Sequence, residues 1–164
     1  MRAVKKKFLL AIPLLCLGFG LSSASVANQP GVESQQKIHN CIEGARQAGL
    51  YPGRCVGLIA DPCINSAKEK DDAADKAKEC AAGELRIWAA RLDKSLAAIK
   101  RADADISLTV GRAQKAWGSA NELCPVFDRL DPGAALGAAE YCRLQATAAR
   151  ALLLEGLELS VSEH

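Results

Sequence analysis

The 164-residue chain contains few of the residues on which catalysis and metal binding usually depend. It has two histidines, His39 and the terminal His164, and it lacks both the Gly-x-Ser-x-Gly and the His-Glu-x-x-His motifs. Paired acids such as Asp71 and Asp72 fall in polar positions near predicted helix starts, where carboxylates favour the helix dipole. We therefore expect a protein that is not an enzyme, with no catalytic residue and no cofactor.

Long apolar runs are also missing after residue 20, where no segment approaches the roughly 18 apolar residues of a spanning helix. Basic residues 5–7, followed by the apolar run 8–20, are typical of a secretory signal peptide. Small residues predict cleavage after Ala27, with Ala24 as the alternative. We expect a soluble mature protein that begins at Asn28, lies in the periplasm or outside the cell and does not insert into a membrane.

Removal of residues 1–27 would delete four basic residues and no acid, so the formal net charge would change from +2 to −2. A slightly acidic protein lacks the basic footprint of a nucleic-acid-binding protein, and we expect no such partner. Six cysteines would remain, an even number that predicts three disulfides in an exported chain. They are Cys41, Cys55, Cys63, Cys80, Cys124 and Cys142. Without C-x2-C pairs or a histidine among them, we expect no metal site.

Apolar periodicity predicts helices and almost no strand. Residues 32–47 form a short helix, and residues 50–66, punctuated by Pro52 and Gly57, form a loop that contains cysteines. Two longer amphipathic helices follow, one from about residue 73 and one that Pro125 ends. After a turn at 128–133, residues 134–159 form a third long helix rich in alanine and leucine. The expected divisions are a signal peptide (1–27), an N-terminal helix and loop (28–66) and a helical domain (67–164).

Short connections make consecutive helices antiparallel neighbours. The predicted fold is therefore all-α, an antiparallel helical hairpin plus a third long helix, stapled by disulfides. If the hairpin turn centres near residue 102, Cys80 lies level with Cys124, and Trp88 lies level with Trp117. This register favours a Cys80–Cys124 disulfide and two buried, neighbouring tryptophans. The alternative for Cys124 is a bridge to Cys142 across the following turn.

Several motifs of the predicted helical domain are found together in one known family. They are Cys80-x3-Glu84-x3-Trp88-x3-Leu92-Asp93, Ala113-Gln114-Lys115-Ala116-Trp117, Cys124, Cys142 and Thr147-x-x-Arg150. Over roughly residues 60–157 the chain resembles the LprI-type lysozyme inhibitor family of small secreted helical domains. Family members usually carry four cysteines, and the resemblance implies that Cys41 and Cys55 bond each other. The expected pairs are then Cys80–Cys124, Cys41–Cys55 and Cys63–Cys142.

The resemblance implies a secreted envelope binding protein that inhibits a lysozyme or another cell-wall hydrolase. The alternative is a periplasmic structural or interaction module with no inhibitory activity. Because a small helical scaffold uses its apolar faces for its own core, we expect recognition in loops, either 50–65 or the turn 128–133. Tyr51 and Arg54 in the first loop are residue types enriched at binding hot spots. Gln114 and Arg150 lie on helix faces, where they bond a neighbouring helix or contact the partner.

Overall fold

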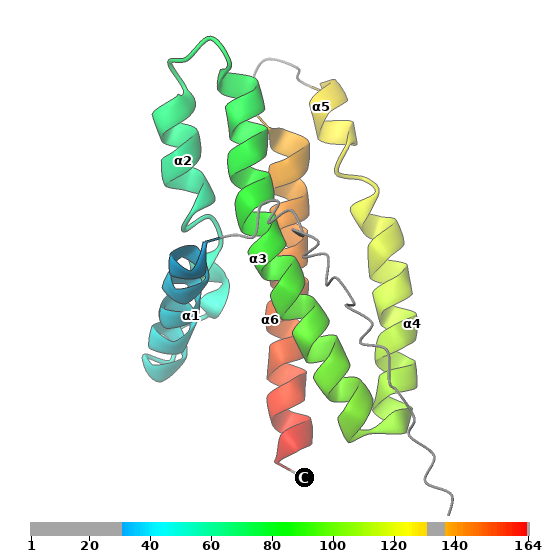
Figure 1. Ribbon diagram of the computed structural model, residues 1–164. Coiled ribbons are helices and arrows are strands. Elements are labelled where there is room, and N and C mark those ends of the chain that lie inside the picture. The colour runs from blue at the N-terminus through cyan, green and yellow to red at the C-terminus, as the bar shows by residue number, and fades with distance from the viewer. Residues whose placement is uncertain (1–30, 131–136, 164) are drawn as a thin grey trace, which may run out of the picture.

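The computed structural model describes residues 31–130 and 137–163 of the chain (Figure 1). The elements are α1 (Val32–Gln47), the 3-10 helix η1 (Pro52–Cys55), α2 (Ala60–Ala67), α3 (Ala73–Ala102), α4 (Ala104–Asn121), α5 (Val126–Leu130) and α6 (Ala138–Ser162). No strand occurs within these residues, so the all-α prediction is confirmed. The predicted signal peptide and its cleavage site lie outside the described residues. None of the described helices has the length and apolar character needed to cross a membrane.

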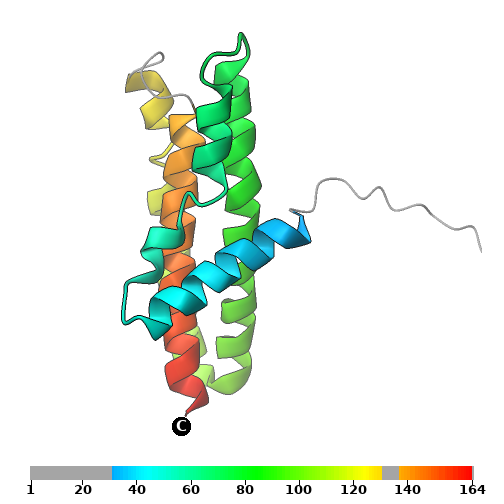
Figure 2. The ribbon, with the colours of Figure 1, turned by 90° about the vertical axis from the view of Figure 1, so that its left-hand side faces the viewer.

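The centre of the fold is the pair of long helices α3 and α6, which lie side by side in both views (Figures 1 and 2). Apolar residues at helical spacing put Trp88 and Leu92 of α3 into one core with Leu144 and Leu154 of α6. The α1 helix crosses this pair obliquely (Figure 2) and contributes fully buried isoleucines to the same core. A single cluster of buried residues therefore unites the N-terminal elements with the long helices.

The predicted hairpin is formed by α3 and α4, which are joined by a tight turn. Asp103 ends α3 and caps α4, where its Oδ1 accepts a hydrogen bond from the Ile106 N–H at 2.7 Å. From this turn the two helices separate toward their other ends (Figure 1). Within α4 only Val110 is buried. The helix that packs along α3 is α6, so α4 forms the outer edge of the bundle.

This arrangement corrects the predicted disulfides. The Cys41–Cys55 prediction is confirmed, whereas the Cys80–Cys124 and Cys63–Cys142 predictions are wrong. The observed bridges are Cys63–Cys80 and Cys124–Cys142, the latter being the alternative considered for Cys124. The expectation that Cys80 and Cys124 lie at the same height fails because α4 diverges from α3 toward the open end of the hairpin. Cys124 instead lies against α6, where it bonds Cys142. Each bridge closes a short segment, with sequence separations of 14, 17 and 18 residues.

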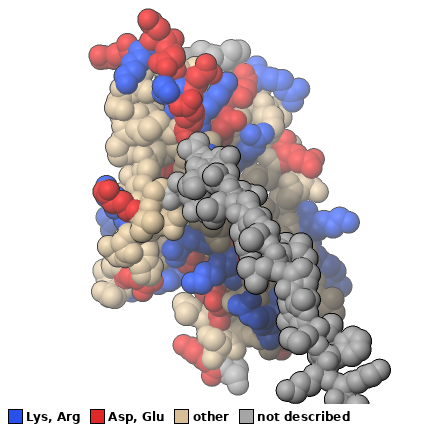
Figure 3. Space-filling model, in the orientation of Figure 1, with Lys and Arg blue, Asp and Glu red and all other residues tan. Residues whose placement is uncertain are grey.

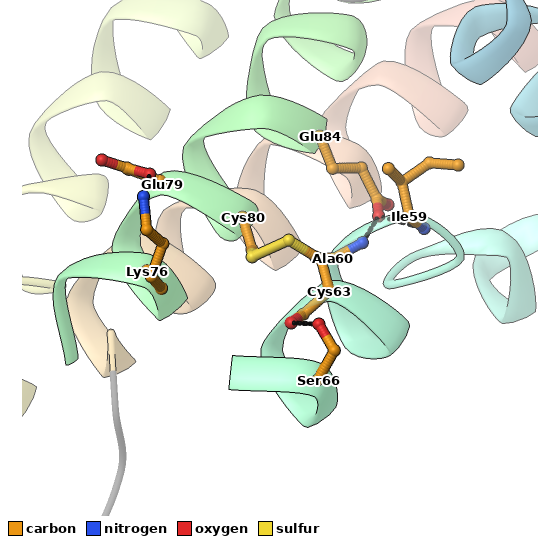
Figure 4. The surroundings of a disulfide bond; sticks show 8 residues. All are labelled: Ile59, Ala60, Cys63, Ser66, Lys76, Glu79, Cys80 and Glu84. Carbon is orange, nitrogen blue, oxygen red and sulfur yellow. Dashed lines mark hydrogen bonds and ion pairs between the residues drawn. A yellow bond between two sulfur atoms is a disulfide. The ribbon is translucent and has the colours of Figure 1, made fainter. Parts of the chain in front are cut away.

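The predicted loop 50–66 is wrong in its second half, which forms α2 alongside α3. Pro62 falls in the first turn of α2, where its missing N–H has no intrahelical partner to lose. This helix brings Cys63 next to Cys80 (Figure 4). The predicted turn 128–133 also differs, since Asp128 lies in α5, while residues 131–133 lie outside the described part of the chain.

The predicted residue ranges of the first helix and of the third long helix agree with the structure for most of their residues. The prediction for residues 32–47 matches α1, and the third long helix is α6, described from Ala138 onward. Trp88 is fully buried as predicted, but Trp117 is only partly buried against the edge of the core. The difference follows from the outward course of α4, which leaves one side of Trp117 open.

Candidate functional site

The connection between η1 and α2 is organised by Glu84, a carboxylate of α3 with no exposed surface. Its Oε1 accepts hydrogen bonds from the Gly57 N–H at 2.8 Å and the Trp88 Nε1–H at 2.9 Å. Its Oε2 accepts from the N–H groups of Ile59 and Ala60, each at 2.8 Å (Figure 4). Glu84 thus satisfies the first free N–H groups of α2 and fixes the path of the chain that leads into it.

Two further features hold this connection against the bundle. Gly57 has a φ of 87°, and a Cβ there would meet the carboxylate of Asp61, so the turn requires glycine. The Tyr141 hydroxyl of α6 donates to Asp61 Oδ1 at 2.7 Å. Burial, followed by this bond to Asp61, raises the pKa of Tyr141 to about 12. The segment between η1 and α2 is therefore tied to both α3 and α6.

The sequence-predicted site residues Tyr51 and Arg54 lie at η1, just before this anchored connection. Cys55 of η1 is fully buried in the core and bonded to Cys41 of α1. Tyr51 remains 71% exposed, and Arg54 is also exposed. Among the described residues, neither side chain has a hydrogen bond or ion pair. A fixed backbone thus presents an aromatic ring and a guanidinium to solvent.

Beside Tyr51 lies a shallow groove of about 580 Å³ between η1 and the outer face of α6. Its apolar wall on α6 includes Leu153, which is 62% exposed, and Leu157. Tyr51 and Pro52 form the opposite wall. We call Tyr51, Arg54 and this groove the η1 surface. The contribution of α6 was missed by sequence reasoning, because only the packing of η1 on α6 brings these distant residues together.

The other two predicted site residues, Gln114 and Arg150, lie at the contact between α4 and α6. Arg150 Nε donates to Gln114 Oε1 at 3.0 Å, and both side chains are partly buried. The bond between neighbouring helices, one of the two expectations for these residues, is therefore confirmed. The structure pairs Gln114 with Arg150 and does not bring them into the η1 surface.

A polar cleft of about 210 Å³ lies where α1 meets α3 and α6. Glu155 lines this cleft and accepts from Arg46 at 2.8 Å and from Arg91 at 2.7 Å. The Arg91 guanidinium also lies 5.9 Å from the centre of the Trp88 ring. His39 also lines this cleft. The network joins three helices, and its charged groups are largely neutralised by one another, so it serves the fold.

Glu84 was also missed as an organising residue, although the sequence carries a signal for it. It lies four residues from both Cys80 and Trp88, so it is an acid within an apolar helical stripe. Its three backbone hydrogen-bond partners, however, come from a segment that sequence reasoning treated as a loop.

The side chains of the η1 surface suit recognition, since the exposed Tyr51, the unpaired Arg54 and the exposed Leu153 favour contact with another molecule. In the described ranges 31–130 and 137–163, no cluster of three or more His, Cys, Asp or Glu side chains could hold a metal ion. Comparisons of the chain with models of protein families, with curated proteins and with solved structures find no match.

Proposed function

We propose that this chain is an exported binding protein of the cell envelope, periplasmic or secreted, which recognises a protein partner through the η1 surface. The proposal depends chiefly on the exposure of Tyr51 and Arg54 on a segment anchored by the Cys41–Cys55 bridge and by Glu84. Three disulfides indicate an oxidising, extracytoplasmic environment. A cell-wall hydrolase of the lysozyme class is the partner that we would test first.

The anchoring matters because a mobile loop loses conformational entropy when it binds. Here the backbone before α2 is held by a disulfide, by three N–H bonds to Glu84 and by the buried Cys55. The side chains of Tyr51 and Arg54 would still have to be ordered, but the backbone that carries them would not. A rigid projection of this kind is suited to a concave partner.

The charge of Arg54 supports a hydrolase as the partner. Enzymes that cleave glycosidic bonds usually place two carboxyl groups on either side of the scissile bond. A guanidinium pairs well with a carboxylate and would be attracted to such a cleft. Tyr51, three residues before Arg54, would cover the surface of the hydrolase beside its cleft. This binding mode predicts inhibition by occlusion of the cleft.

A second candidate is an interaction module that binds its partner without inhibiting it. The groove beside Tyr51 favours this function, because its apolar wall of Leu153 and Leu157 extends along α6. A shallow apolar groove of this shape fits a helix or an extended segment better than the rim of an enzyme cleft. The two candidates differ in whether occupation of the η1 surface changes a hydrolase rate.

The test uses the exported, oxidised protein, with lysozymes and envelope hydrolases assayed for clearance of peptidoglycan. We expect inhibition by the natural chain, and the double variant Tyr51→Ala/Arg54→Ala should bind at least about tenfold more weakly, or about 1.4 kcal/mol. The matched control is Phe127→Ala/Arg129→Ala, which removes an exposed aromatic ring and an arginine from α5. The melting temperature of both variants should be unchanged.

Each result distinguishes the proposals. Hydrolase binding without inhibition would favour the interaction module. Loss of binding in the Phe127/Arg129 variant alone would move the site to α5, which overlaps the start of the predicted turn 128–133. If the Tyr51/Arg54 variant retained full affinity for a partner that the natural chain binds, the η1 surface would be excluded.

A further inference from the structure

Charge is unevenly distributed along the chain, with its basic excess in the hairpin of α3 and α4. Residues 86–119 contain seven Lys or Arg and three Asp or Glu. The flanking segments are acidic, with nine acids and seven bases in residues 31–85, and seven acids and three bases in residues 120–163. Figure 3 shows basic side chains over the lower part of the molecule and along its right-hand side, where α4 runs, whereas acidic and basic side chains are mixed at the upper end. The molecule therefore presents one basic region on an otherwise acidic chain.

Most cations of this region have no acidic partner within the described residues. Arg91 pairs with Glu155, but the other six have no ion pair within the described residues. These six exposed residues are Arg86, Lys94, Lys100, Arg101, Arg112 and Lys115. Elsewhere, Lys37 and Lys76 each pair with an acid on their own helix. Of the three acids in the hairpin, Asp103 is occupied as the cap of α4, whereas Asp93 and Asp105 are exposed, so the region keeps a net excess of four positive charges.

An apolar side chain lies within this basic region. Leu108 of α4 is 68% exposed. It precedes Arg112 by four residues and Lys115 by seven, so all three share the outer face of the helix. Next to the hairpin turn, Lys100 and Arg101 lie in the last turn of α3. We call Lys100, Arg101, Leu108, Arg112 and Lys115 the hairpin surface.

We propose that the hairpin surface attaches the protein to the surface of an anionic phospholipid membrane. Clustered lysines and arginines are attracted by acidic headgroups, and the attraction grows with each cation near the bilayer. An apolar side chain among them can enter the boundary between headgroups and acyl chains, which a soluble polyanion does not offer. Leu108 thus favours a lipid surface over a dissolved anionic polymer. We propose attachment at the membrane surface only, since none of the described helices is long and apolar enough to cross a bilayer.

The position of the hairpin surface leaves the η1 surface accessible. Figure 1 places α4 on one side of the α3–α6 pair and α1, which η1 follows, on the other. A protein held to lipid through α4 would therefore present Tyr51 and Arg54 away from the bilayer. Membrane attachment does not depend on the proposed partner, so the two proposals can fail separately.

The test is flotation of the exported, oxidised protein with vesicles of equimolar phosphatidylglycerol and phosphatidylcholine. We expect binding at about 50 mM salt, loss of binding at about 0.5 M salt, and little binding to phosphatidylcholine alone. Lys100→Gln/Arg112→Gln/Lys115→Gln should lower the affinity at least about tenfold. Leu108→Ser should lower it without changing its dependence on salt.

The matched control neutralises three cations at the opposite end of the molecule, Lys68→Gln/Lys70→Gln/Lys78→Gln, and should bind as the natural chain does. Circular dichroism should show equal helix content in all variants. Equal losses in the two triple variants would indicate an effect of net charge alone and would overturn the proposed surface. Binding to soluble polyphosphate but not to anionic vesicles would overturn the choice of lipid.

Discussion

The indole of Trp88 donates its Nε1–H to Oε1 of Glu84 at 2.9 Å, one turn earlier on the buried side of α3. The same oxygen accepts the Gly57 N–H at 2.8 Å. A core side chain and the start of the η1–α2 connection therefore share one carboxylate. Because a buried carboxylate without partners is costly, the packing of the core and the path of the connection depend on each other.

Glu84→Gln should destabilise the fold by about 2–4 kcal/mol. The amide has nearly the same shape, but its nitrogen cannot accept a hydrogen bond and would face N–H groups that now bond to Oε1 or Oε2. Urea unfolding of the oxidised protein measures the effect. The control is Glu79→Gln, which breaks an exposed pair with Lys76 and should cost less than about 0.5 kcal/mol. Equal losses would contradict the role of Glu84.

The two tryptophans should differ in their contribution to stability. Trp88→Ala removes a fully buried ring and should cost about 3–5 kcal/mol. Trp117→Ala removes a partly buried ring at the edge of the core and should cost about 1–2 kcal/mol, since less apolar area is lost from burial. Thermal and urea unfolding provide both values. A larger loss at Trp117 than at Trp88 would mean that α4 is more closely packed than the structure has it.

The exported protein should contain no free thiol at positions 41–142. Labelling under denaturing, non-reducing conditions checks this expectation, and peptide mapping of the oxidised chain checks the connectivity. We expect peptides joined through Cys63–Cys80 and through Cys124–Cys142. Recovery of a peptide that joins Cys80 to Cys124 would restore the register expected from the sequence and contradict the outward course of α4.

Tyr141 should contribute to a loss of stability at high pH. Its pKa is about 12 in the folded protein and 10.0 without the surrounding structure. Folding therefore favours the neutral form of the Tyr141 side chain. Its contribution to the free energy of unfolding is fully present below pH 10 and is lost as the pH rises toward 12. The absorbance of tyrosinate should show a step near pH 12 in the natural chain and in Tyr51→Phe, but not in Tyr141→Phe. A step that persists in Tyr141→Phe would refute the assignment.

The sequence was sufficient to predict the helices that have a clear apolar stripe. The spacing of Ala81, Trp88, Leu92 and Ile99 identifies α3, because each of these residues returns to the same face of a helix. The α2 helix escaped prediction because Gly57 and Pro62 are typical of loops. Proline is compatible with the first turn of a helix, but no capping residue in the sequence indicates that a helix begins at Ala60.

The candidate site could be predicted only in part. Exposure of Tyr51 and Arg54 follows from the turn residues around them, and the structure agrees. The apolar wall of Leu153 and Leu157 and the anchoring by Glu84 depend on how distant helices pack. The wrong disulfides have the same origin, since a register counted from one turn assumes that two helices stay in contact along their whole length.

The pairing of the six cysteines has a consequence for how the protein reaches its oxidised state. Each cysteine from Cys41 to Cys142 is bonded to its immediate neighbour in chain order. When a chain crosses a membrane from its N-terminus, each partner therefore arrives shortly after the first sulfur and before any competing cysteine. Oxidation in order of emergence yields the native set directly, so maturation of this protein should not require a disulfide isomerase.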